Sequence, residues 1–347
     1  MINNIWHIGS FLLAAGLLAG CSADPLDDEG LLPQEIKVQV GSAPSTDATR
    51  ASIINDDTDL QTKDIRIETY YHGTTTPHIS EAKLHYGSSS WGFVNGSGDA
   101  ISYFWPIEGS VLAPSGTGTS LDFVGYAPYT APSYIGNISY SVANGLSFQC
   151  TTLPVTSAGQ ASLDEFMYAI VPNQTLSSDN GAPKAGSNVG KVALDLQHPF
   201  SKISLQLKTS HRAIYNLKSI TFKGIKNNGT FTHGDSPQWV LSGSNTNLEI
   251  TLNQGISQDA DFTSAQVSSM RLPLIVLPQS LSTAGQIEVK LTWNSGDSES
   301  TYTFDNPVSN WESGKSYNYT LDLLGEIKFT VSVEAWVTES TRRNLRF

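Results

Sequence analysis

The residues that could do chemistry form incomplete motifs in this sequence. A Gly-Lys-Ser tripeptide at 314–316 matches the end of a phosphate-binding loop, but the glycine required five positions earlier is Ser309. A calcium loop starting at Asp57 would need glycine at its sixth position, where the sequence has Thr62. The seven histidines include no His-Glu-x-x-His pair, and there is no Gly-x-Ser-x-Gly nucleophile motif. The motifs therefore predict no catalytic residue, metal site or cofactor, and an enzyme is the least supported class of protein.

Cys21 is the side chain whose position best predicts a reaction. An apolar run from Ile8 to Ala19 has the length of a signal-peptide core, and Leu-Ala-Gly stands directly before Cys21. This ending resembles the bacterial lipobox, in which the cysteine thiol receives a lipid. Residues 1–21 are therefore predicted to be a lipoprotein signal peptide, although the first seven residues lack the usual Lys or Arg. The alternative is a secretory peptide that happens to contain a cysteine. The second cysteine, Cys150, is expected in the core.

Acidic residues dominate both the segment after Cys21 and the chain as a whole. Asp24, Asp27, Asp28 and Glu29 lie in a proline-containing stretch that is too polar to pack, so we expect a tether. This stretch also resembles the acidic signal of surface-exported lipoproteins of Bacteroidales. The chain has 20 Lys and Arg against 32 Asp and Glu, a net charge of −12. This sign is wrong for binding a phosphate backbone, so nucleic acid is not an expected partner.

From residue 36 onward, apolar and polar residues alternate with the period of β-strands. The clearest runs are 36–40, 65–68, 192–196, 203–207, 248–252, 287–293, 317–323 and 327–333. Clusters of Gly, Asn and Ser separate many of them, and half-buried strands of this type are typical of antiparallel sandwiches. The best helix candidate is a capping-box pattern at Ser162–Glu165, with room for about two turns.

The length of 347 residues is that of two domains. A stretch rich in Ser, Gly, Asn, Ala and Pro at 177–188 lies between two strand-rich halves. Such a composition is typical of a linker, so we place the domain boundary there. The prediction is an N-terminal β-sandwich over 51–185 and a C-terminal β-sandwich over 186–347.

An aromatic stretch in the first half has two interpretations. It comprises Tyr86, Trp91, Phe93, Tyr103, Phe104, Trp105, Phe123, Tyr126, Tyr129 and Tyr134. Such rings could stack on a glycan, but packing between strands is the commoner role of aromatic side chains. We expect core packing and keep a glycan platform as the alternative.

Four segments together resemble the fimbrillin family, the type V pilins of Bacteroidales. They are Val192–Ile203, Leu274–Gln279, Trp311–Tyr319 and Val331–Trp336. The resemblance rests on their order, their spacing to the chain end and the lipobox, and it is weakest over residues 80–157. It implies an all-β fold of two transthyretin-like antiparallel β-sandwich domains, which agrees with the strands found above.

The resemblance also implies a route of maturation. In such pilins an arginine-specific or trypsin-like protease removes the leader together with the first strand, which opens a hydrophobic groove. The polar stretch between the first two predicted strands contains Arg50 and Ala51, the candidate cleavage site. An ordinary loop arginine is an equally good interpretation. Residues 22–50 would then be an acidic leader with a removable first strand, whose apolar face is Ile36, Val38 and Val40.

Assembly in the family occurs when the C-terminal segment of the next subunit fills this groove by donor-strand exchange. The candidate donor strand here has apolar residues at alternate positions, as an added strand must. These residues are Ile327, Phe329, Val331, Val333 and Ala335. The alternation is equally consistent with the last strand of the chain's own domain.

We therefore expect a structural subunit of a surface fimbrium, exported as a lipoprotein, matured by proteolysis, polymerised by donor-strand exchange and supporting adhesion. Its expected partners are other pilin subunits, including anchor and tip proteins, the outer membrane through the lipid of the precursor, and a host or bacterial surface ligand. Its expected location is the outer cell surface and then the fimbrium. The alternative is a non-polymerising surface lipoprotein, acting as a pilus anchor, a tip adhesin or a glycan-binding protein.

Overall fold

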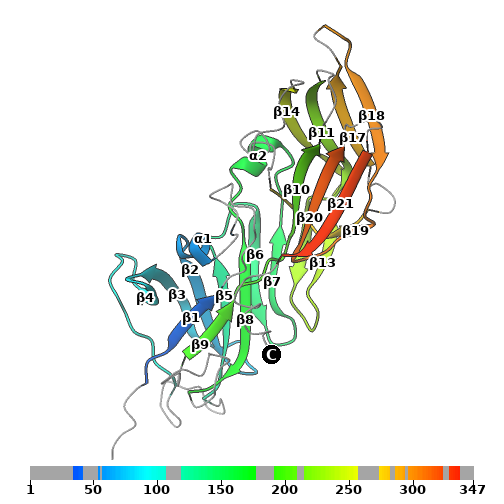
Figure 1. Ribbon diagram of the computed structural model, residues 1–347. Helices are drawn as coiled ribbons and strands as arrows, with labels where there is room; N and C mark the ends of the chain where they lie inside the picture. The colour runs from blue at the N-terminus through cyan, green and yellow to red at the C-terminus, as the bar shows by residue number, and fades with distance from the viewer. Residues whose placement is uncertain are drawn as a thin grey trace, which may run out of the picture. The chain divides into compact units, whose positions relative to one another are not determined.

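The computed structural model describes residues 34–41, 54, 57–106, 119–176, 191–208, 215–256, 273–281, 286–293, 296–322 and 328–336. Strands dominate these ranges, and the only helices among them are the short α1 (Asp57–Gln61) and α2 (Ser157–Ala161) (Figure 1). Neither helix is long enough to cross a membrane. The predicted all-β fold class is confirmed.

A five-stranded antiparallel sheet organises the first part of the structure. Its order is β4 (Ser90–Val94), β3 (Pro77–Gly87), β2 (Ile65–Tyr71), β5 (Leu121–Ala127) and β8 (Met167–Gln174). A two-stranded sheet packs on one face and consists of β1 (Lys37–Gly41) and β9 (Lys191–Asp195). A four-stranded sheet packs on the other face in the order β13 (Gln238–Ser242), β12 (Asn228–Thr232), β7 (Gly145–Cys150) and β6 (Ile135–Ser141).

Strand β5 is buried along its whole length because it contributes to the cores on both faces of this sheet. Successive side chains of a strand point to opposite faces. Leu121 and Phe123 accordingly enter the core beneath β1, whereas Val124 and Tyr126 enter the core shared with β7 and β12. This explains why β5 lacks the polar alternation seen in β2.

The second sandwich has two facing four-stranded sheets. One has the order β15 (Leu274–Val276), β10 (Ser201–Lys208), β20 (Lys315–Asp322) and β21 (Lys328–Ala335). The other has the order β14 (Thr246–Ile256), β11 (Tyr215–Ile225), β17 (Gln286–Thr292) and β18 (Ser300–Asp305). The short pair β16 (Gln279–Ser280) and β19 (Asn310–Trp311) completes the described strands. A separate apolar core joins the two larger sheets.

Two features of the pairing differ from the antiparallel sheets expected from the sequence. β1 pairs with β9 in parallel, and β10 pairs with β20 in parallel. In addition, β12 pairs with β7, although the two strands lie on opposite sides of the predicted boundary between 185 and 186. The boundary itself lies outside the described residues and stays a prediction.

The predicted helix at Ser162–Glu165 is wrong, because the helix lies earlier in the chain. Thr156 caps α2, and its side-chain oxygen accepts a hydrogen bond from the Gly159 amide at 3.2 Å. Ser162 is the residue at which the helix ends. The Glu165 side chain forms no capping box and is instead completely buried in tertiary contacts.

Most of the aromatic stretch packs in cores, as expected. Phe93, Trp105, Phe123, Tyr126 and Tyr134 are buried, whereas Phe104 is 45% exposed. The predicted core position of Cys150 is also confirmed, and burial raises the pKa of its thiol to about 12.

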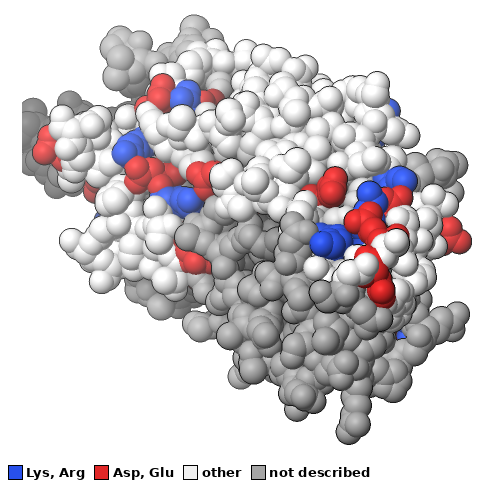
Figure 2. Space-filling view, turned by 90° about the horizontal axis from the view of Figure 1, so that it is seen from above, with Lys and Arg blue, Asp and Glu red and all other residues white. Residues whose placement is uncertain are grey.

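Charged side chains of the first sheet pair with one another at the surface. Arg66 contacts Glu68 and Glu81 at 2.9 and 2.8 Å, and Lys83 contacts Asp64 at 2.6 Å. On the face seen in Figure 2, basic side chains likewise lie next to acidic ones. Such exposed pairs contribute little to stability, so the buried apolar clusters hold the fold.

We expect Phe148→Ala to destabilise the protein by about 3–5 kcal/mol, because truncating a fully buried aromatic residue leaves a cavity. Phe148 contacts Phe166, Phe231 and Trp239, with ring centroids 4.8–5.6 Å apart. Val240→Ala is the control, since Val240 is 66% exposed, and its effect should stay within about 0.5 kcal/mol. Urea denaturation measures both variants, and equal effects would contradict the assignment of this core.

Candidate assembly site

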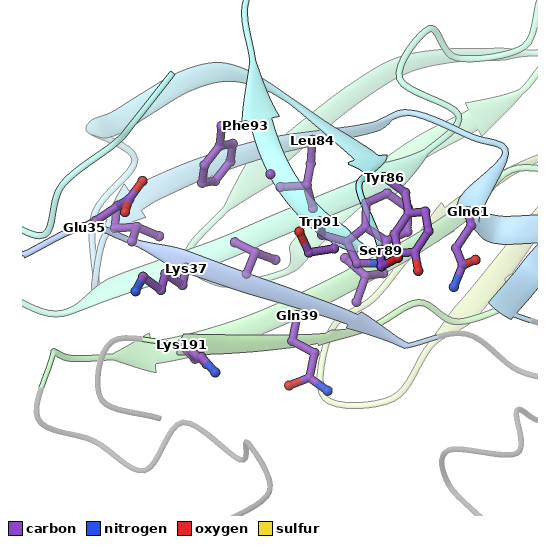
Figure 3. Close-up of a pocket in the computed structure, with 15 residues that line it drawn as sticks. Glu35, Lys37, Gln39, Gln61, Leu84, Tyr86, Ser89, Trp91, Phe93 and Lys191 are labelled. Atoms are coloured by element: carbon purple, nitrogen blue, oxygen red, sulfur yellow. The ribbon is translucent and has the colours of Figure 1, made fainter. Parts of the chain in front are cut away.

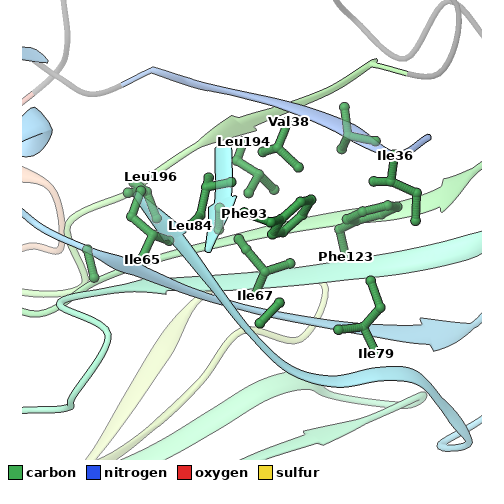
Figure 4. Packing of buried hydrophobic residues seen from close by; sticks show 14 of the residues in the cluster. Ile36, Val38, Ile65, Ile67, Ile79, Leu84, Phe93, Phe123, Leu194 and Leu196 are labelled. Atoms are coloured by element: carbon green, nitrogen blue, oxygen red, sulfur yellow. The ribbon is translucent and has the colours of Figure 1, made fainter. Parts of the chain in front are cut away.

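Strand β1 contributes one apolar face to the core of the first sandwich. Ile36 is 1% exposed and Val38 is 9% exposed, while Val40 is partly buried against the same cluster. Figure 4 shows Ile36 and Val38 pointing from β1 toward Phe93 and Phe123. The predicted removable strand therefore lies in a core, with its predicted apolar face inward.

Backbone pairing holds β1 mainly along one edge. It pairs along one edge with β9, from Lys37 opposite Lys191 to Gly41 opposite Asp195. Just before the strand, the Ile36 amide donates to the Tyr103 carbonyl at 2.8 Å. Between residues 37 and 41, no strand in the described part of the chain pairs with the second edge. Side-chain burial is therefore a major part of what holds β1 in place.

A pocket of about 550 Å³ lies along β1 and the hairpin of β3 and β4. Figure 3 shows Tyr86, Trp91 and Gln61 together at one end, and Glu35 and Phe93 at the other. The rings of Tyr86 and Trp91 meet edge to face, with centroids 5.3 Å apart. Polar and apolar side chains both line this pocket. Its position beside a strand edge suits an added strand, while aromatic rings next to an amide also suit a sugar.

Removal of β1 would leave a costly surface. Fully burying a Val or Ile side chain contributes about 1.5–3 kcal/mol. Loss of β1 would remove the two buried side chains Ile36 and Val38 and would also uncover their neighbours, including Leu194 and Phe123. A subunit without β1 would therefore expose apolar side chains that are now buried.

Strand β21 lies at the edge of its sheet and pairs with β20 over eight residues, from Lys328 to Ala335. Phe329 and Val331 are partly buried against the core of the second sandwich. Val333, on the same face, is 49% exposed, and Ala335 is exposed as well. Ile327 lies outside the described residues.

Trp336, directly after β21, is only 3% exposed. Its amide donates to the Gly314 carbonyl at 2.6 Å. Its ring stacks on His198, with centroids 3.8 Å apart and an interplanar angle of 12°. The last residue of the described chain is therefore fixed in a core.

A buried polar pair stands next to this stack, and sequence reasoning did not assign it a role. His198 Nδ1 lies 2.5 Å from Glu165 Oε1, and both side chains are almost completely buried. Burial, followed by the charge of Glu165, raises the pKa of nearby Tyr134 well above its usual value. His198 lies in one of the four family-like segments, which was the only available signal, and nothing in the sequence linked it to Glu165.

The remaining predicted site residues, Cys21, Arg50 and Ala51, lie outside the described residues. The first described residue after them is Ile54, which is 1% exposed. In the described ranges, no three His, Cys, Asp or Glu side chains are grouped so that they could hold a metal ion.

The profile of the fimbrillin-like family matches residues 49–336, which is most of the chain. The chain belongs to the fimbrillin-like family. Among proteins with curated descriptions, none matches it. The family supports a structural, fimbrial role at the cell surface, in association with other fimbrial subunits.

Two solved structures show the same fold as this fimbrillin-like chain at low sequence identity, and a third is similar to it at a lower score. A candidate cell adhesion protein from Bacteroides ovatus has 18% identity and a TM-score of 0.53, covering 88% of this chain and 98% of its own. One from Bacteroides uniformis has 16% identity and a TM-score of 0.51, covering 87% and 99%. The tip fimbrial protein Mfa3 of Porphyromonas gingivalis, with a C-terminal truncation, has 10% identity and a TM-score of 0.43, covering 87% and 100%.

We expect Val38→Asp to detach β1 from this fimbrillin-like chain, because it places a carboxylate in an apolar core. Hydrogen exchange of the amides in Lys37–Gly41 should accelerate about 10-fold or more. Gln39→Asp is the matched control, since Gln39 is exposed on the same strand, and it should leave exchange unchanged. Unchanged exchange in Val38→Asp would mean that backbone pairing alone holds β1.

Proposed function

We propose that this protein is a fimbrial subunit that is exported as a lipoprotein through Cys21 and matured by cleavage between Arg50 and Ala51. Cleavage releases residues 22–50, including Ile36, Val38 and Val40. The C-terminal strand of a neighbouring subunit, with Ile327, Phe329, Val331, Val333 and Ala335, then enters the groove. Subunits polymerise in this way into a fimbrium that supports adhesion.

The observation that carries this proposal is the burial of β1 with pairing along one edge only. Ile36 and Val38 are as buried as core residues, yet among the described strands β1 pairs only with β9 between Lys37 and Gly41. The core thus uses β1 mainly as a source of alternating apolar side chains. Any strand with the same alternation can supply them.

The C-terminal strand has features that suit the donor role. Its face carries apolar residues at 329, 331, 333 and 335, and the second half of that face is exposed. An edge strand with an exposed apolar face is a natural place for association with another chain. The partners in this proposal are further copies of the chain together with anchor and tip subunits, and the lipid of the precursor would bind the outer membrane.

One observation favours the second candidate, a non-polymerising surface lipoprotein such as an anchor, a tip adhesin or a glycan-binding protein. Phe329, Val331 and Trp336 already pack in the chain's own cores, which favours a subunit that keeps its last strand. In that case, the pocket with Tyr86, Trp91 and Gln61 would stay lined by β1.

We expect brief trypsin treatment of residues 22–347 to give one stable product that begins at Ala51, together with heat-sensitive ladders on an unheated gel. Arg50→Ala should abolish this product, because trypsin cleaves only after Lys or Arg. Lys37→Ala, on the exposed face of β1, is the matched control and should still be processed at Arg50. Intact mass identifies the products. An unchanged product from Arg50→Ala would show that cleavage occurs at another residue.

We expect Val333→Asp to leave the monomer folded and to abolish ladders. Val333 is 49% exposed in its own subunit, so a carboxylate is tolerated there, whereas it would be buried in the groove of a neighbour. Val240→Asp, at an even more exposed valine, should polymerise normally. Ladders from Val333→Asp would exclude β21 as the donor strand.

A further inference from the structure

Glu165 connects two segments that are far apart in the sequence. Its side chain is completely buried, and each of its oxygens has a partner. Oε2 accepts a hydrogen bond from the Ile54 backbone amide at 2.9 Å, and Oε1 lies 2.5 Å from His198 Nδ1. One carboxylate thus fixes both Ile54 and the plane of the His198 ring.

His198 in turn determines how the end of β21 packs. Its ring lies flat on Trp336 at 3.8 Å, and the Lys202 Nζ atom stands over the indole at 5.5 Å. Lys202 itself is 1% exposed. Trp336 is therefore held between polar side chains rather than by apolar neighbours alone, and its position depends on theirs.

Two atoms in this cluster are buried without hydrogen bonds among the described residues. They are His198 Nε2 and Trp336 Nε1. Unsatisfied buried groups destabilise a protein. Maximal stability therefore does not explain the cluster. A role in fixing the positions of the segments at Ile54 and Trp336 does explain it.

We propose that Glu165 and His198 form a buried relay that couples the packing of Ile54 to the packing of Trp336. If the Ile54 amide leaves, Glu165 Oε2 loses its donor in a site closed to solvent. The carboxylate must then rotate or admit water, and His198 loses the bond that fixes its ring. The stack on Trp336 weakens, and the coupling acts equally in the reverse direction.

The functional meaning of this relay rests on the proposed function. Ile54 lies four residues after Arg50, and Trp336 ends the candidate donor strand. The relay would therefore make β21 easier to release once the segment around the cleavage site has changed. Maturation and donor availability would be linked within one subunit.

Hydrogen exchange of the full chain tests the coupling directly, because both ends of the relay are backbone amides with known acceptors. In Trp336→Leu, exchange of the Ile54 amide should accelerate about 5- to 100-fold. In Ile54→Pro, which deletes the donor, exchange of the Trp336 amide should accelerate within the same range. Ile54→Ala trims the side chain but keeps the amide, and should have a smaller effect on Trp336.

A double-mutant cycle and a matched buried carboxylate complete the test. His198→Phe keeps an aromatic ring but lacks Nδ1. Adding Trp336→Leu to this variant should therefore no longer accelerate hydrogen exchange of the Ile54 amide. Asp122→Asn is the control, because Asp122 is also buried and binds a backbone amide, that of Asn173, and His72. It should leave hydrogen exchange of the Ile54 and Trp336 amides unchanged. If Trp336→Leu fails to fold, Trp336→Phe provides a milder change, with the same sign of effect expected at Ile54.

Acceleration confined to the mutated end would overturn the relay, and so would equal acceleration in Asp122→Asn, which would indicate general loosening. The measurement does not depend on polymerisation. Coupled amides without ladders would refute the proposed function alone, and ladders with uncoupled amides would refute the relay alone.

Discussion

The first core is closed by the short pair of strands β1 and β9, and its dependence on β1 shapes the sandwich around it. β1 is five residues long and, among the described strands, pairs only with β9. Ile36 and Val38 fill the space above Phe93 and Phe123, so the core is complete only while a strand presents apolar side chains at alternate positions. The core requires that pattern of side chains, and nothing in the packing requires that they come from residues 36–40.

The sandwich also has a second core, to which β1 contributes no side chain. The five-stranded sheet is anchored on its opposite face, where Val124 and Tyr126 of β5 pack in a second cluster with Phe148 and Phe231. Loss of β1 would therefore uncover one face of the sheet and leave the other core in place. A strand can be exchanged without global unfolding only in such an arrangement, because the remaining core must keep the groove in shape.

The sequence predicts where the strands lie better than it predicts which strands pair. Alternation at 65–68, 287–293 and 317–323 falls on β2, β17 and β20, because each of these strands buries one face. Alternation shows which residues face a core but carries no information on the partner strand. The parallel pairs β1–β9 and β10–β20 were therefore not predictable.

The same limit explains the failures at the site. The pattern at Ser162–Glu165 matches a capping box, but the Glu165 carboxylate is used by Ile54 and His198, which are distant in the sequence. No local rule can predict such a partner. The apolar faces of β1 and of the C-terminal strand were predictable because each depends only on residues two apart.

If strand β21 is a donor, as proposed, it must satisfy two demands that oppose each other. Phe329, Val331 and Trp336 hold it in its own subunit, while Val333 and Ala335 leave the same face open. Transfer to another subunit is favourable only if the receiving groove buries at least as much apolar surface as the strand exposes when it leaves its own subunit. The groove of β1 receives side chains at three alternate positions, 36, 38 and 40, and the face of β21 has the same spacing. In the proposed assembly, the exposed half of β21 would favour transfer, because Val333 and Ala335 would gain burial that their own subunit does not provide.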